Sequence, residues 1–92
     1  MTELVYAGQD VQEIIAARWP TAKFTDASDG VHEDRFEVEV PCGSDEFYVE
    51  MIRKGLALHC FAFNLMMGMT EGAKRVRRWM DVAKAASVPT EG

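Results

Sequence analysis

The chain has 92 residues, a hydrophobic content of 48%, a charged content of 27% and a formal net charge of −5. A single domain of this length buries about 60–65% of its unfolded surface, and the composition is that of a globular protein rather than a disordered one. The basic groups are too few for general nucleic-acid binding by phosphate neutralisation. We therefore expect one domain over residues 1–92, with residues 87–92 as a frayed tail.

The first predicted element is an amphipathic helix over residues 9–18. Val11, Ile14 and Ile15 fall at helical spacing and should be buried on one side of this helix. Pro20 ends it, because the residue before a proline is pushed out of the α region.

The start of this helix has two interpretations. Asp10 with Glu13 resembles a capping box, which would start the helix near Asp10. The alternative helix begins near Thr2 and runs through Gly8, at a cost of about 1 kcal/mol for the glycine. We prefer the shorter helix.

Three segments after this helix are predicted as strands. The second, from Phe36, and the third alternate apolar and polar residues, which is typical of strands with one buried and one exposed face. The three segments cover residues 22–27, 31–40 and 46–53, with glycine-containing turns between them. The side chains expected to face the core are Phe36, Val38, Val40, Phe47, Val49 and Met51. The polar residues between them should look outward.

Residues 56–63 are apolar on both faces apart from His59. This run fits a buried central strand or the first turns of a buried helix, and periodicity does not decide between the two. The preceding Gly55 and the short connection favour a strand.

The last predicted element is a helix that begins at Thr70 and ends before Pro89. Half of the ten basic residues of the chain lie on its other side and flanks. The apolar stripe at helical spacing contains Ala73, Val76, Trp79, Met80, Ala83 and Ala86. Together these elements predict an α+β fold: a helix, an antiparallel three- to four-stranded meander and a C-terminal helix, in a two-layer sandwich.

The sequence offers no constellation for catalysis, metal or cofactor binding. Cys42 and Cys60 form neither a disulfide framework nor a C-x-x-C pair, which indicates a reducing, cytoplasmic environment. His59 and Cys60 are adjacent and would point to opposite faces of a strand. The longest nearly uncharged run, residues 55–70, is shorter than the roughly 20 apolar residues that span a bilayer. We expect no enzyme activity, no cofactor and no membrane partner.

Acidic residues are concentrated in the middle of the chain, on the strand positions expected to look outward. This distribution bears on partners and association rates. The candidate partner-binding residues are Glu33, Asp34, Glu37, Glu39, Glu46, Tyr48 and Glu50. We expect this acidic face to bind a protein with a basic surface, with no direct contact to nucleic acid. In size and charge the chain is similar to small acidic antagonists such as phage anti-restriction, anti-CRISPR and some immunity proteins, by analogy only.

Two other functions compete with this hypothesis. The apolar segment 56–69 would make the chain a homodimeric regulatory or chaperone-like module. Its candidate interface residues are Leu65, Met66, Met67 and Met69. A small enzyme or metal-binding domain ranks last, because no two catalytic groups converge in the predicted strands.

Overall fold

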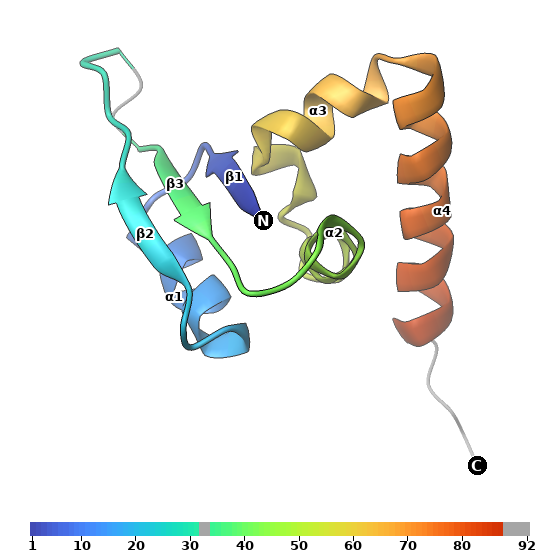
Figure 1. Cartoon of the computed structure of the whole chain (residues 1–92), viewed down its shortest axis with the longest axis horizontal. Helices are drawn as coiled ribbons and strands as arrows, with labels where there is room; N and C mark the ends of the chain where they lie inside the picture. The colour runs from blue at the N-terminus through green and yellow to red at the C-terminus, as the bar shows by residue number, and fades with distance from the viewer. Residues whose placement is uncertain (32–33, 88–92) are drawn as a thin grey trace.

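The computed structural model describes residues 1–31 and 34–87 and has an α+β fold (Figure 1). A frayed tail at residues 87–92 lies outside the described residues, except for Ser87, which ends the last helix. The elements in chain order are β1 (Thr2–Val5), α1 (Gln9–Arg18), β2 (Lys23–Asp26), β3 (Phe36–Glu39), α2 (Ser44–Arg53), the 3-10 helix η1 (Ala57–His59), α3 (Phe61–Met67) and α4 (Thr70–Ser87).

The sheet has three strands in the order β1-β3-β2, and both outer strands run antiparallel to β3. The outer strands are therefore parallel to each other, and helix α1 supplies the long connection that such a pair needs. Strand β1 was not predicted, and a helix beginning near Thr2 is wrong. Because the central strand comes last in the chain, the order differs from that of a simple meander.

Helix α1 has the predicted bounds, and Val11 and Ile15 are buried in the core. Ile14 is 38% exposed, so its predicted burial is wrong. The N-cap residue is Gly8 rather than Asp10, which lies in the first turn. A carboxylate in the first turn still suits the positive end of the helix dipole.

Two segments predicted as strands are helical. Residues 46–53 belong to α2, where Phe47, Tyr48 and Met51 are all buried. These positions are spaced i, i+1 and i+4, as on one side of a helix, and a strand would have turned Tyr48 outward. Residues 56–63 form η1 and the start of α3, so the helical alternative is the better one.

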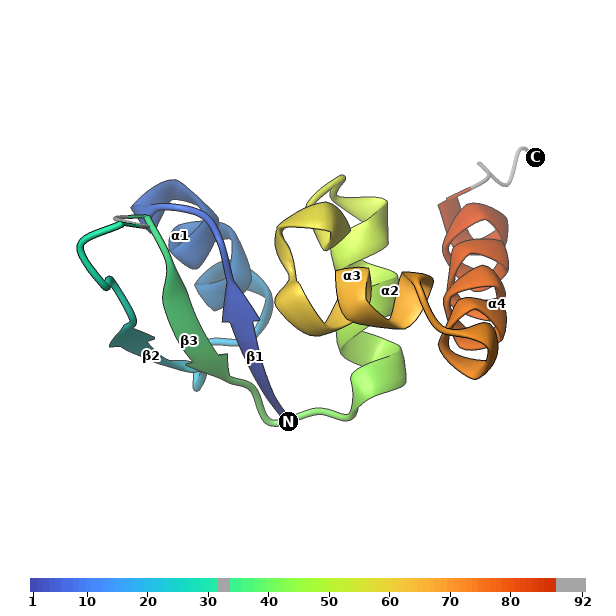
Figure 2. The ribbon, with the colours of Figure 1, turned by 90° about the horizontal axis from the view of Figure 1, so that it is seen from above.

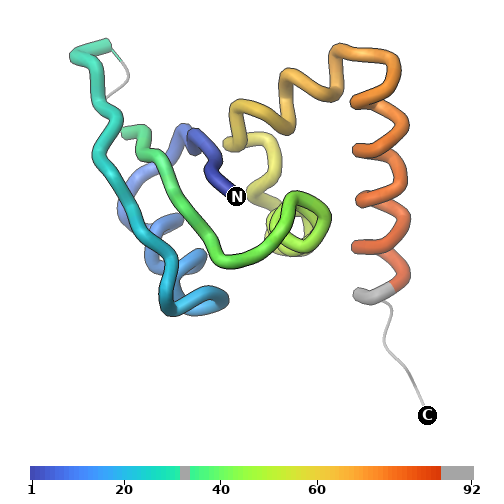
Figure 3. Tube along the Cα trace, in the orientation of Figure 1, coloured from blue at the N-terminus to red at the C-terminus, as the bar shows by residue number. Residues whose placement is uncertain are grey.

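The molecule is elongated, with principal extents of 47 × 32 × 20 Å. Figure 2 shows the sheet and α1 at one end, α2 and α3 in the middle, and α4 at the other end. The chain passes from the sheet to the helices through residues 40–43 (Figure 3). Helix α1 lies against one face of the sheet, and the other face, turned toward the viewer in Figure 1, carries no helix.

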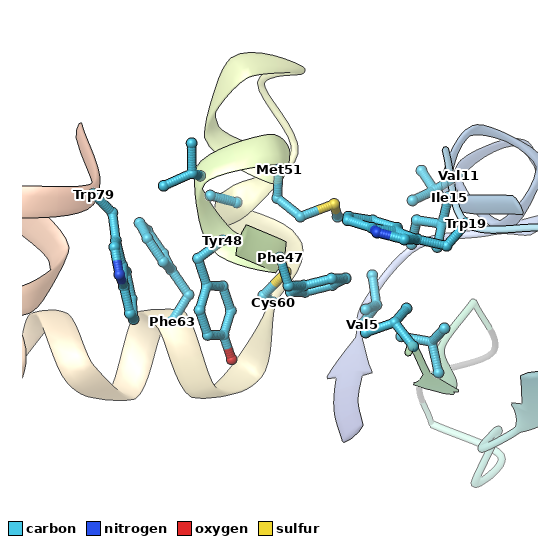
Figure 4. Packing of buried hydrophobic residues seen from close by; sticks show 14 of the residues in the cluster. Val5, Val11, Ile15, Trp19, Phe47, Tyr48, Met51, Cys60, Phe63 and Trp79 are labelled. Atoms are coloured by element: carbon cyan, nitrogen blue, oxygen red, sulfur yellow. The ribbon is translucent and has the colours of Figure 1, made fainter. Parts of the chain in front are cut away.

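A row of aromatic rings runs from α4 through α2 to the C-terminal end of α1 (Figure 4). The ring of Tyr48 stacks on that of Trp79 with centroids 4.8 Å apart, and Phe47 meets Trp19 at 5.4 Å. In α4 the predicted stripe is buried at Val76, Trp79 and Ala83, whereas Met80 is 41% exposed. The side chain of Ala86 lies outside the described part of the structure.

Candidate partner-binding surfaces

Glu37 and Glu39 lie on the open face of the sheet and are exposed, as predicted from the alternation in β3. We call these two residues the acidic sheet face. The strand register places Thr25 beside Glu37 and Lys23 beside Glu39 on the same face. Within the described residues, neither carboxylate has a basic group within ion-pair distance.

Asp34 is exposed just before β3 and extends the negative charge toward the start of α1. A methyl group added to Gly8 would meet the Oδ1 atom of Asp10 at 3.5 Å and the Cγ atom of Asp34 at 3.8 Å, so these two carboxylates lie near each other. Glu33, also predicted for the binding face, lies outside the described residues.

Glu46 and Glu50 do not belong to the acidic sheet face, because they lie one turn apart on α2. The guanidinium of Arg18 contacts both, at 2.9 Å from Glu46 and 3.9 Å from Glu50. Glu50 is also paired with Arg53 at 3.3 Å and with Lys54 at 3.5 Å. These carboxylates are therefore largely neutralised by their own chain, and their assignment to a sheet surface is wrong.

Tyr48 is 2% exposed and cannot contact a partner without unfolding, which corrects its predicted place on the binding face. Its hydroxyl donates a hydrogen bond to Glu3 Oε1. Burial raises the pKa of Tyr48, and the hydrogen bond to this carboxylate raises it further. The residue is a structural part of the core.

Glu3 is a buried carboxylate that no pattern in the sequence indicates. It is 3% exposed, and its Oε2 atom accepts a hydrogen bond from the Ala62 N–H at 2.8 Å. Burial raises the pKa of Glu3, and the hydrogen bonds from Tyr48 and Ala62 partly oppose this effect. Residues 2–5 do not alternate apolar and polar side chains, and pairing with β3 turns Glu3 and Val5 inward.

A second surface of different chemistry covers η1 and α3. Large apolar side chains project from it: Leu58 is 68% exposed, Phe61 47% and Leu65 56%. Met67 and Met69 are also exposed, at 42% and 56%, whereas Met66 packs partly against the core. Beside this ridge lies an apolar groove of about 330 Å³, lined by Ile52, Gly55, Ala57, Leu58, Phe63, Met67 and Met80.

The groove between α2 and α4 has a volume of about 320 Å³ and mixes acidic and basic side chains. Asp45 accepts a hydrogen bond from Trp79 Nε1 at 2.6 Å and lies 3.8 Å from the Arg75 guanidinium. Together with the pairs made by Arg18 and Arg53, this arrangement leaves little net charge for an ionic ligand.

The two thiols and His59 offer little chemistry in the described part of the chain. Burial raises the pKa of Cys60 and of the half-buried Cys42, and nearby Glu46 adds to the effect at Cys42. A nucleophilic thiol needs the opposite shift. The Nδ1 atom of His59 lies 3.0 Å from the Tyr6 carbonyl oxygen. Among residues 1–31 and 34–87, three or more histidine, cysteine or carboxylate side chains nowhere gather as metal ligands.

No helix in the described part of the chain is both long enough and apolar enough to cross a membrane. Comparison of the chain with protein-family models, curated proteins and solved structures finds no match.

Proposed function

We propose that the chain is a small, non-enzymatic protein-binding module that docks its acidic sheet face on a basic surface of a partner protein. The observation that carries this proposal is which carboxylates are paired with basic groups of the same chain and which are not. Glu37 and Glu39 are exposed, with no ion pair to any described residue, whereas Glu46 and Glu50 are paired with basic groups of α1 and α2. Of these four glutamates, the two on the sheet are the ones left for a partner.

The distribution of charge along the molecule supports the same face. Residues 1–43, which form the sheet and α1, contain nine acids and three bases, a formal charge of −6. Residues 44–92 contain six acids and seven bases, a formal charge of +1. The molecule is 47 Å long, and charges in water are screened beyond about 8 Å at physiological salt. A partner approaching the sheet end therefore meets an essentially negative surface.

A surface that binds nucleic acid is a suitable partner because it is built to accept negative charge. Glu37 and Glu39 are two residues apart on one strand, so their spacing is roughly 6–7 Å. A nucleic-acid strand carries a phosphate about every 3.4 Å of helix axis. The two carboxylates would therefore take the place of two phosphates about two steps apart along the backbone. Docking there would block the partner's own ligand, which is the action of an antagonist. Such a role places the chain in the cytoplasm with its target.

Association through this face should be fast and sensitive to salt. The test is affinity capture from cells of the native source with the wild type, with E37K/E39K and with E71K/D81K as a matched control. The control makes the same change in net charge on α4, at the other end of the molecule. The proposal expects a protein with a basic, nucleic-acid-binding surface to be lost with E37K/E39K alone. Equal capture of that protein by E37K/E39K contradicts it.

A second candidate function is a homodimeric regulatory or chaperone-like module. The exposed ridge of Leu58, Phe61 and Leu65 beside an apolar groove favours it, because large exposed apolar patches usually mark association sites. Segment 55–70 contains no Asp, Glu, Lys or Arg, so two copies could meet there without charge repulsion. Sedimentation equilibrium tests this function: a dimer that Leu65→Glu dissociates supports it, and a monomer at micromolar concentration removes it.

A further inference from the structure

The two edges of the sheet differ in how they are closed. At the outer edge of β1, Val5 forms an isolated antiparallel bridge with Cys60, and the Tyr6 N–H donates to the His59 carbonyl at 2.8 Å. No other segment of the described chain pairs with the outer edge of β2, which lies at the far side of the sheet in Figures 1 and 2.

The strand register identifies the backbone groups on this open edge. Ala27 N–H donates to the Arg35 carbonyl at 3.2 Å, so Ala27 directs its backbone toward β3. Alternate residues of an antiparallel strand point their backbone groups in opposite directions. Thr25 therefore also faces β3, while the N–H and C=O groups of Phe24 and Asp26 point outward.

We infer that the edge of β2 accepts an extended, basic segment of the partner as a fourth strand of the sheet. Strand addition of this kind takes its affinity from main-chain hydrogen bonds and its specificity from alternate side chains. The inference rests on the proposed function, and it specifies how the basic partner is held.

The side chains around the edge define the segment. Asp26 is exposed on the edge itself, and hydrogen bonds from Ser28 lower its pKa, which keeps it negative. On the open face, a long basic side chain placed beside Thr25 could reach over it toward Glu37. On the other face the edge offers Phe24, half-buried against Phe36 with ring centroids 5.6 Å apart, which suits an apolar side chain.

The charge of the sheet end favours a basic segment of another protein over a second copy of this chain as the added strand. Edge-to-edge pairing of two copies would bring together two sheet ends with a formal charge of −6 each. Like charges at an interface suppress association. A basic strand from another protein meets attraction at the same place, so the edge selects an oppositely charged partner.

The experiment titrates the full-length chain with the synthetic peptide KVRVKTRVK, which is acetylated at its N-terminus and amidated at its C-terminus. Backbone amide chemical shifts of the protein report binding, and the titration gives the dissociation constant. Binding should shift the amide signals of Phe24 and Asp26. Asp26→Pro removes an outward N–H that β3 does not use, and proline is tolerated on edge strands. Asp26→Ala is its matched control, because both variants lose the carboxylate. Asp26→Pro should bind at least about tenfold more weakly than Asp26→Ala.

A second probe leaves the protein unchanged. Two peptides are N-methylated on alternate residues, one on the odd and one on the even positions. In an added strand, only alternate N–H groups of the peptide face β2. Strand addition therefore predicts that methylation of those N–H groups abolishes binding, whereas methylation of the other N–H groups is tolerated. Docking by charge alone predicts the same affinity for both.

The outcomes separate this inference from the proposed function. If both methylated peptides bind alike while E37K/E39K loses binding, strand addition is wrong and the acidic sheet face still docks. If E37K/E39K binds the peptide as tightly as the wild type, both are wrong. Failure of the wild type to bind the peptide overturns the strand inference, whereas the docking proposal is then decided by the capture experiment.

Discussion

The hydroxyl of Tyr48 on α2 donates a hydrogen bond to the buried carboxylate of Glu3 on β1. The other oxygen of this carboxylate accepts the Ala62 N–H of α3 at 2.8 Å. Glu3 therefore joins the sheet to two helices within the core, at the boundary between the acidic end of the molecule and its helical end. Buried polar groups of this kind stabilise a fold only while every partner is present.

Tyr48→Phe should lower the free energy of unfolding by about 1–3 kcal/mol, because it leaves a buried carboxylate oxygen without its donor. Urea unfolding of the wild type, Tyr48→Phe, Glu3→Gln and the double variant measures the coupling between the two side chains. The double variant should lose less than the two single losses added together. Strictly additive losses would mean that the hydrogen bond contributes nothing.

The pH dependence of stability should change when Glu3 is replaced by glutamine. Burial raises the pKa of Glu3 above its ordinary value of 4.5, so the folded state holds this proton more tightly than the unfolded state. The stability contributed by the protonated form is complete below pH 4.5 and is lost as pH rises through the folded pKa.

Glu3→Gln carries no titrating group at this position, so its stability relative to the wild type should improve as pH rises above 4.5. Urea unfolding of both proteins over a series of pH values gives this difference. Parallel curves for the two proteins would show that Glu3 has the same pKa in the folded and unfolded states.

Gly72→Ala should destabilise the protein even though alanine is the better helix former by about 1 kcal/mol. A Cβ atom at this buried position would lie 2.5 Å from the Met66 carbonyl oxygen, which is backbone and cannot rotate away. Forcing α3 and α4 apart should cost about 1–3 kcal/mol. Thermal unfolding compares the melting temperature of Gly72→Ala with that of the control Gly68→Ala. At Gly68 the added Cβ would lie 3.6 Å from the nearest atom, which is an ordinary contact. Equal melting temperatures for the two variants would contradict this close approach.

The two thiols should differ in reactivity. Cys60 is fully buried and its pKa is raised by burial, whereas Cys42 is partly exposed. In the folded protein, a chromogenic disulfide reagent should modify Cys42 slowly and Cys60 only after addition of denaturant. Cys42→Ser should remove the reaction of the folded state. A folded Cys42→Ser protein that still reacts would mean that Cys60 is accessible.

The elements with an unambiguous local signal were predicted with their bounds. The helix at Gln9–Arg18 and the one that begins at Thr70 each combine apolar spacing with a stop or start residue. The strand at Lys23–Asp26 and the second half of residues 31–40 were also predicted. The α+β class follows from these elements alone.

The prediction for residues 46–53 is wrong because the spacing of their apolar residues fits both a strand and a helix. Phe47, Val49 and Met51 alternate as in a strand, and the same residues with Tyr48 also fit one side of a helix. The acids Asp45 and Glu46 after Gly43 are a helix-start signal that should have outweighed the alternation. This error placed Glu46, Tyr48 and Glu50 on the predicted binding face, whereas the structure puts them on α2 and leaves Glu37 and Glu39 on the sheet.

Strand β1 has no local signal, because Thr2–Val5 is short and turns a glutamate inward. It becomes a strand through pairing with β3, which is a contact between residues far apart in the chain. Tertiary context of this kind overrides short-range propensity. The buried Glu3 could not have been found from the sequence for the same reason.

The most direct test of the acidic sheet face is the dissociation constant of the captured partner at about 50 and about 200 mM salt, measured for the wild type, E37K/E39K and E71K/D81K. We expect E37K/E39K to bind at least about tenfold more weakly and to lose most of the salt dependence, while E71K/D81K stays within about threefold of the wild type. If E37K/E39K keeps the affinity and the salt dependence of the wild type, the acidic sheet face is not the binding surface.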